Sequence, residues 1–112
     1  MGGVNPEGHE PLTSSVLHVL LALSRGPVHG YGVLRRVEED SGLRMGPGTI
    51  YGTLGRLQDA GLVEDAGEDR EDPRRGRRFA ITPAGRDILQ AEAERIRRLG
   101  VLTSALLQGE ER

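Results

Sequence analysis

Residues 47–61 have the sequence PGTIYGTLGRLQDAG, and this stretch decides the fold. Proline is favoured in the first turn of a helix, because its missing N–H needs no partner there, and glycine is common just beyond a helix end. Between these two signals, Ile50, Leu54 and Leu57 recur at helical spacing. The stretch therefore predicts a short amphipathic helix that buries one apolar face.

The opposite face of this predicted helix presents small and hydrogen-bonding side chains, namely Thr49, Gly52, Thr53 and Arg56. Threonine can reach base edges or touch a thymine methyl group, and arginine can contact either a guanine edge or a phosphate. Tyr51 lies near this side, where its hydroxyl suits a phosphate contact. The helix is therefore a candidate for entering a DNA groove, and an ordinary solvated face is the alternative.

Two more helices are predicted upstream. The first runs from residue 12 or 13, where a threonine or serine hydroxyl can cap it, to residue 25, before a glycine-proline pair. The second spans about 30–40 and closes at Gly42. We expect Tyr31 to lie in its apolar stripe and pack in the core. We expect His29 to begin the helix rather than to serve as a metal ligand or catalytic base, since no partner residue has a matching spacing.

A two-stranded hairpin is predicted after the third helix, with strands at 62–64 and 78–81. Glycine and proline residues mark the turn between them. Four arginines flank this turn and could project positive charge toward a DNA backbone or minor groove: Arg74, Arg75, Arg77 and Arg78. Acidic residues between 64 and 72 could instead neutralise them by internal pairing, so both outcomes remain open.

The last predicted helix begins at Thr82 and Pro83, a capping hydroxyl followed by proline, and continues to about Leu107. Roughly 25 helical residues extend nearly 40 Å, farther than a small domain can cover. Its apolar stripe therefore predicts pairing with the same helix of a second copy. The predicted dimerisation residues are Leu89, Ile96, Leu99, Leu102 and Leu106.

Several motifs together resemble the PadR family of transcriptional regulators: GPVHGYG at 26–32, PGTIYGTL at 47–54, GLV at 61–63 and RFAITPAG at 78–85. Their order and spacing make the resemblance specific. It covers roughly residues 12–107. The chain departs from the family pattern at Gly52, where proline is frequent, and beside Phe79, where a second aromatic is frequent.

The resemblance implies a dimeric bacterial repressor that usually responds to a small molecule, here of the short subfamily with one C-terminal helix. The expected fold is mainly α with a small β-hairpin, a winged helix-turn-helix followed by a long dimerisation helix. The expected parts are a disordered N-terminal arm at 1–11, a DNA-binding domain at 12–82, and a dimerisation helix and tail at 83–112. The expected partners are double-stranded DNA, a second copy of the chain and an effector of unknown identity.

Composition narrows the function further. The 112 residues carry a formal net charge of -2 and no cysteine, so disulfides and thiolate zinc sites are excluded. No nucleophile elbow, phosphate loop or carboxylate-histidine cluster is present, so we expect neither an enzyme nor a bound cofactor. No apolar run is long enough for a membrane span and no signal peptide is evident, so the expected location is the cytoplasm. The acidic balance leaves one rival, a winged-helix protein-interaction module without specific DNA binding.

Overall fold

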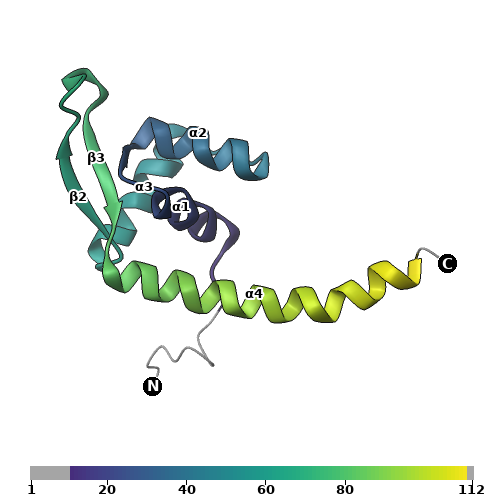
Figure 1. The fold of residues 1–112 in the computed structure, drawn as a ribbon. Helices are drawn as coiled ribbons and strands as arrows, with labels where there is room; N and C mark the ends of the chain where they lie inside the picture. Colours follow the sequence, from purple (N-terminus) through teal and green to yellow (C-terminus); the bar gives the residue numbers. More distant parts are fainter. Residues whose placement is uncertain (1–10, 111–112) are drawn as a thin grey trace.

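The computed structural model describes residues 11–110, which form four α-helices and a small antiparallel sheet (Figure 1). In chain order the elements are α1 (Ser14–Ser24), β1 (Val28–His29), α2 (Gly30–Ser41), α3 (Pro47–Asp59), β2 (Val63–Glu68), the 3-10 turn η1 (Pro73–Arg75), β3 (Arg77–Ile81) and α4 (Pro83–Glu110). This order confirms the predicted mainly helical fold. The expected N-terminal arm, apart from Pro11, lies outside the described residues.

Local capping chemistry sets the helix boundaries where the sequence predicts them. The Thr13 hydroxyl accepts a hydrogen bond from the Val16 N–H (3.3 Å) and begins α1. His29 Nδ1 accepts from the Gly32 N–H (3.0 Å) and begins α2, which confirms its predicted place at a helix start. Gly42 ends α2 with a φ of 76°, a conformation that costs glycine little. Each cap satisfies a backbone group that the helix itself leaves without a partner.

The core lies where α1, α2 and α3 meet, with single contributions from β2 and α4. Each helix supplies the apolar residues that its 3.6-residue repeat gathers on one face. Burying them removes apolar surface from water, the main force that holds the three helices together. The buried apolar residues are Val19, Leu20, Ala22, Leu23, Val33, Val37, Ile50, Leu54, Leu57, Val63 and Leu89.

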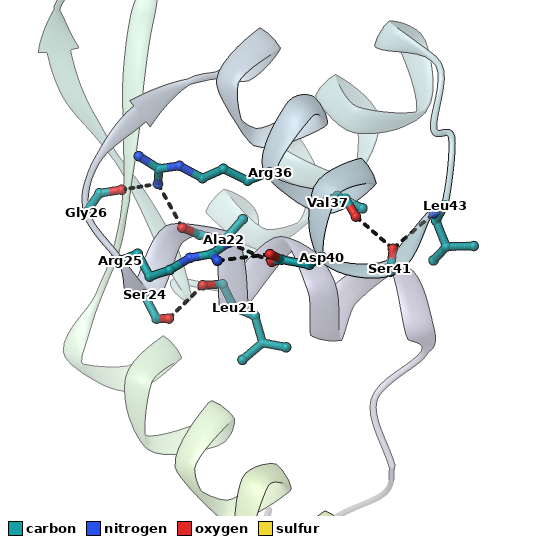
Figure 2. Close-up of polar contacts among 10 residues, drawn as sticks. All are labelled: Leu21, Ala22, Ser24, Arg25, Gly26, Arg36, Val37, Asp40, Ser41 and Leu43. Atoms are coloured by element: carbon teal, nitrogen blue, oxygen red, sulfur yellow. Dashed lines mark hydrogen bonds and ion pairs between the residues drawn. The ribbon is translucent and has the colours of Figure 1, made fainter.

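Two arginines fasten the end of α1 to α2 (Figure 2). Arg36 Nη1 donates to the carbonyl oxygens of Ala22 (2.8 Å), in the last turn of α1, and of Gly26 (2.9 Å), just beyond the helix. Arg25 forms a two-pronged ion pair with Asp40, at 2.9 and 2.6 Å. The hydrogen bond from Arg25 lowers the pKa of the Asp40 carboxyl, so this pair stays ionised near neutral pH.

The sheet has one strand more than predicted. Val28 and His29 form the short strand β1, which pairs with β3 opposite Phe79 and Arg78. The strand order is therefore β1-β3-β2, all antiparallel. A strand of two residues shows no alternation of polar and apolar side chains, so a periodicity search overlooks it.

Strand β2 is also longer than predicted, because it continues through a bulge. The pairing with β3 shifts register between Asp65 and Gly67, and Gly67 has a φ of 91°. A glycine within a strand often marks such a bulge. The hairpin formed by β2, η1 and β3, hereafter the wing (residues 63–81), extends away from the helices (Figure 1).

Helix α4 begins at the base of the wing and runs past the rest of the molecule (Figure 1). The Thr82 hydroxyl caps it by accepting from the Gly85 N–H (3.0 Å), as predicted. Leu89 is only 7% exposed and belongs to the core of the single chain, which leaves little of its surface for the predicted dimer contact. The first turns of α4 pack against α1, so this part of the apolar stripe is already buried within the chain.

The predicted burial of Tyr31 is wrong. It is 60% exposed, whereas we predicted a core residue. The buried face of α2 consists of Gly30, Val33 and Val37, with Leu34 partly buried against the core, and Tyr31 lies outside it. Among residues 11–110, no helix is long and apolar enough to cross a membrane.

Candidate nucleic-acid interface

The exposed face of α3 is built by the same repeat that buries its other face. Ile50, Leu54 and Leu57 are buried, whereas Thr49, Gly52 and Arg56 are exposed. Proline at the first helical position fixes the start of the helix and leaves Thr49 in its first turn. These three residues match the predicted outward face.

Thr53 departs from the prediction, because only 1% of its surface is exposed. It follows Ile50 by three positions and precedes Leu57 by four, so it belongs to the buried row of the helix. Its hydroxyl accepts a hydrogen bond from Arg56 Nη2 (3.2 Å). The predicted outward position of Thr53 is therefore wrong, and the residue instead orients the guanidinium of Arg56.

Tyr51 joins α3 to both α2 and the wing. Its ring lies against Gly30, where a Cβ atom would come within 2.4 Å of Tyr51 Cζ. It also meets the ring of Phe79 in an edge-to-face arrangement, with centroids 6.4 Å apart. Half of Tyr51 remains exposed, at 49%. The predicted surface position is correct, but the residue also holds the wing beside the exposed face of α3.

The arginines of the wing turn lie beside carboxylates of the same turn. Arg74 Nε donates to Asp72 (3.1 Å). Arg75 lies 3.6 Å from Asp72 and 3.8 Å from Asp69, distances of an ion pair rather than a hydrogen bond. Backbone N–H groups of Glu71 and Asp72 lower the pKa of Asp69, so this partner is ionised at neutral pH.

The arginines of strand β3 are paired as well. Arg77 hydrogen-bonds Asp65, which lowers the pKa of that carboxyl, and lies 3.9 Å from Glu68. Arg78 Nη2 donates to the Ala66 carbonyl oxygen (3.2 Å), the group that the bulge displaces from the ladder. Carboxylates thus pair with Arg74, Arg75 and Arg77, but all three remain more than half exposed, so the predicted projection of positive charge toward DNA stays a prediction.

Three helices followed by an antiparallel wing, with α3 exposing a polar face beside it, is the arrangement of a winged helix-turn-helix. The model of the PadR-like family of transcriptional regulators matches residues 17–91. The chain belongs to this family. PadR-family members are transcriptional regulators and not enzymes, in agreement with the sequence analysis.

Two relatives support this assignment. Transcriptional regulator Rv3488 of Mycobacterium tuberculosis is 36% identical over 84 residues, which cover 74% of this chain and 76% of that protein. An uncharacterized 37.1 kDa protein in transposon TN4556 of Streptomyces fradiae is 46% identical over 81 residues. That match covers 72% of this chain but only 22% of the Streptomyces protein, so the chain corresponds to about a fifth of its length.

The PadR-like transcriptional regulator of Bacillus cereus has the same fold. Its crystal structure superposes with a TM-score of 0.73, covering 84% of this chain and 91% of that one, at 23% sequence identity. At this level of identity, the likeness concerns the fold alone.

Two features of this PadR-family chain escaped the sequence analysis. Gly30 makes room for Tyr51, and Gly85 lies so close to the Leu62 carbonyl that a Cβ atom would be 2.2 Å from its oxygen. The glycines within the motifs at 26–32 and 78–85 were the only sequence signal of these two close contacts. Glu92 is completely buried, and accepts hydrogen bonds from the Leu12 N–H (3.1 Å) and from Arg95 (2.8 and 2.7 Å). No local pattern indicates that this acid of α4 meets the segment just before α1.

The distal half of α4 keeps its apolar side chains in solvent. Ile96, Leu99, Leu102 and Leu106 recur every three or four residues and are all exposed, up to 70% at Leu102 and Leu106. We call these four residues the distal stripe. Contiguous exposed apolar surface of this kind is typical of an interaction site.

Proposed function

We propose that this PadR-family regulator is a sequence-specific DNA-binding repressor that acts on an inverted-repeat operator as a homodimer. The observation that carries the proposal is the exposed row of Thr49, Gly52 and Arg56 on α3, beside the wing. Small residues allow a helix to approach base edges closely, and an arginine oriented by Thr53 suits a guanine or a phosphate. Since Thr53 is buried, base contacts are assigned to Thr49 and Arg56.

The second copy is assigned to the distal stripe. Ile96, Leu99, Leu102 and Leu106 would pack against the same residues of a partner, which removes apolar surface from water on both helices. Residues 12–82 would then form the DNA-binding unit and residues 83–112 the dimerisation helix and tail. The segment around Leu89 and Glu92 connects them rigidly, because it is already buried against α1.

Two-fold symmetry sets the form of the operator. Two copies of α3 would occupy successive major grooves on one side of the duplex, so the half-sites should be about 34 Å apart or a multiple of that spacing. The wing arginines Arg74, Arg75, Arg77 and Arg78 would contact the flanking backbone, and Tyr51 a phosphate. Such contacts add affinity without sequence choice.

Selection from randomised duplexes tests the proposal directly. The native protein should enrich one inverted repeat, and its affinity should fall steeply as the salt concentration rises, since phosphate contacts release counterions. Recovery of genome-bound DNA would then locate the operator and the regulated gene. Selection of no repeat would reject a specific repressor.

The paired arginines of the wing favour one competing function, a winged-helix protein-interaction module. Carboxylates that already occupy Arg74, Arg75 and Arg77 leave less net charge for DNA. Weak binding with a flat salt dependence, on every duplex alike, would favour that module. If the protein is the proposed repressor, it acts in the bacterial cytoplasm and releases its operator when it binds a small effector. Adding candidate metabolites to the preformed DNA complex would detect this release.

A further inference from the structure

A cavity of about 580 Å³ lies between the start of α2 and the turn of the wing, a size suited to a small ligand. The cavity is separate from the exposed face of α3, and two of its residues, Arg74 and Arg75, are wing arginines to which the proposed function assigns backbone contacts. The β1–α2 segment contributes His29, Tyr31, Gly32, Arg35 and Glu39, and η1 contributes Arg74 and Arg75. Two elements far apart in the sequence thus bring three guanidinium groups to one cavity.

Two of the three arginines of this cavity are held loosely, whereas Arg74 donates a hydrogen bond to Asp72 (3.1 Å). Arg35 lies 4.0 Å from Glu39, and Arg75 lies 3.6 and 3.8 Å from its two carboxylate neighbours. All three distances exceed that of a hydrogen bond. More than half of each arginine side chain is exposed, and exposed ion pairs of this kind contribute little stability. An anion that offered shorter contacts would therefore displace these pairs at small cost.

Neighbouring groups favour an anion as well. His29 Nδ1 accepts the Gly32 N–H, so the neutral ring carries its proton on Nε2 and can donate from there. The start of α2 adds the positive end of a helix dipole. Tyr31 is exposed beside these groups and provides a hydroxyl.

We propose that this cavity binds a phosphate-type oxyanion, gripped by Arg35 from one side and Arg75 from the other. The planar guanidinium group matches the geometry of phosphate and can donate two parallel hydrogen bonds. Two such groups on facing walls would hold one anion between α2 and the wing and so fix the position of the wing.

The oxyanion has two sources, a DNA backbone phosphate or a small phosphorylated molecule. Tyr51 of α3 lies over Gly30, directly beside His29 and Tyr31, so a duplex against α3 would pass next to the cavity. This placement favours the backbone phosphate, and that choice of source rests on the proposed function. Oxyanion binding itself does not depend on it.

Titration of the full chain with inorganic phosphate, at constant ionic strength set by chloride, tests the cavity without DNA. The His29 ring resonances should shift and saturate, and Arg35→Gln should weaken phosphate binding about tenfold, the usual effect of losing one charge-assisted hydrogen bond. Arg98→Gln is the matched control, since Arg98 is also half exposed and lies 3.9 Å from an acid four residues away in its helix. No saturable shift, or equal effects of the two variants, would overturn the proposal.

Duplexes with single uncharged methylphosphonate linkages then distinguish the sources. If the anion is a backbone phosphate, one symmetric pair of linkages should weaken the native protein but not Arg35→Gln. Saturable phosphate binding without any such coupled linkage would assign the cavity to a small phosphorylated molecule. A protein that binds no duplex at all would reject the proposed function, and the phosphate titration would still decide the cavity.

Discussion

The buried Thr53 fixes the orientation of the exposed Arg56 on α3. Its guanidinium is exposed on α3 yet donates to the hydroxyl of Thr53, which is itself buried among apolar neighbours. The hydrogen bond limits the rotamers that Arg56 samples, and a side chain that is already ordered loses less entropy on binding. Under the proposed function, Thr53 would therefore influence DNA binding through Arg56 rather than by direct contact.

Replacing Arg56 by alanine tests whether it recognises a base. We expect affinity to fall by about 1 to 3 kcal/mol, with relaxed preference at one symmetric pair of operator positions. Thr53→Val should keep the fold but lose part of this preference, since it removes only the hydroxyl that orients Arg56. Arg86→Ala, an exposed arginine at the start of α4, serves as the control.

Selected operator sequences and binding isotherms provide the comparison. Unchanged preference with uniformly lower affinity would make Arg56 a phosphate contact. If neither affinity nor preference changed, Arg56 would lie outside the interface.

At the scale of elements, the wing contains carboxylates that pair with its own arginines. Asp72 caps η1 by accepting the Arg74 N–H (3.1 Å), and also lies against the side chains of Arg74 and Arg75. Any phosphate must compete with this carboxylate. The wing therefore offers less net positive charge than its arginine content suggests.

Asp72→Asn should raise the affinity for all duplexes alike and steepen the dependence of log K on log salt by about one unit, since an arginine becomes available for one more phosphate. Asparagine keeps the cap, because its side-chain oxygen still accepts the backbone N–H. Glu71→Gln removes the same charge from the same turn, and within residues 11–110 the side chain of Glu71 forms no ion pair with an arginine. Equal effects of the two variants would show that only the overall charge matters.

The junction between the wing and α4 is a tightly packed contact between backbone atoms. Gly85 lies against the backbone of Leu62, and Thr82 donates through its N–H to the same carbonyl (3.0 Å). This close approach sets the direction in which α4 leaves the domain. Backbone atoms form the contact, so they cannot move aside as a flexible side chain would.

Gly85→Ala should lower the free energy of unfolding by about 1 to 3 kcal/mol, the usual effect of overpacking. Gly100→Ala is the control, because nothing lies within 4 Å of its Cβ position and alanine favours a helix by up to about 1 kcal/mol. Denaturant unfolding of both variants at equal protein concentration measures the difference. A Gly85→Ala protein as stable as the control would show that the junction is not tight.

On the scale of the whole molecule, the chain is too elongated for a self-contained domain. Its radius of gyration is 16.0 Å, against about 13 Å for a compact domain of this size. Its longest dimension is 55 Å. The distal half of α4 accounts for this shape and leaves the distal stripe exposed (Figure 1).

Leu102→Asp should convert a dimer into monomers, because it places a charge within the apolar interface, where its desolvation is costly. Ser104→Asp adds the same charge on the opposite side of α4 and should leave the dimer intact. Light scattering at micromolar concentration measures both. A dimer that tolerated Leu102→Asp would rule out the distal stripe as the interface.

Truncation separates dimerisation from folding. A chain that ends after Arg95 keeps Leu89 and Glu92 in the core, so we expect a folded monomer. A chain that ends after Gly85 loses both residues and should be insoluble or unfolded. A stable dimer from either truncation would place the interface elsewhere.

The sequence by itself determined the helices, their ends and the wing, because these depend on local signals. Capping by Thr13 and Thr82, proline at the start of α3 and the glycine that ends α2 all act within a few residues of themselves. Apolar periodicity likewise located most of the core. The motifs at 26–32, 47–54 and 78–85 were sufficient to indicate the PadR family.

Only the tertiary structure decided which residues of each face are accessible. Thr53 and Leu89 became buried and Tyr31 exposed, because the width of each buried face depends on how neighbouring elements pack against it. Strand β1, the contact of Gly85 with Leu62 and the pairing of Glu92 with the segment just before α1 join segments distant in the sequence. The cavity between α2 and the wing arises in the same way, since its arginines lie about 40 residues apart and meet only after folding.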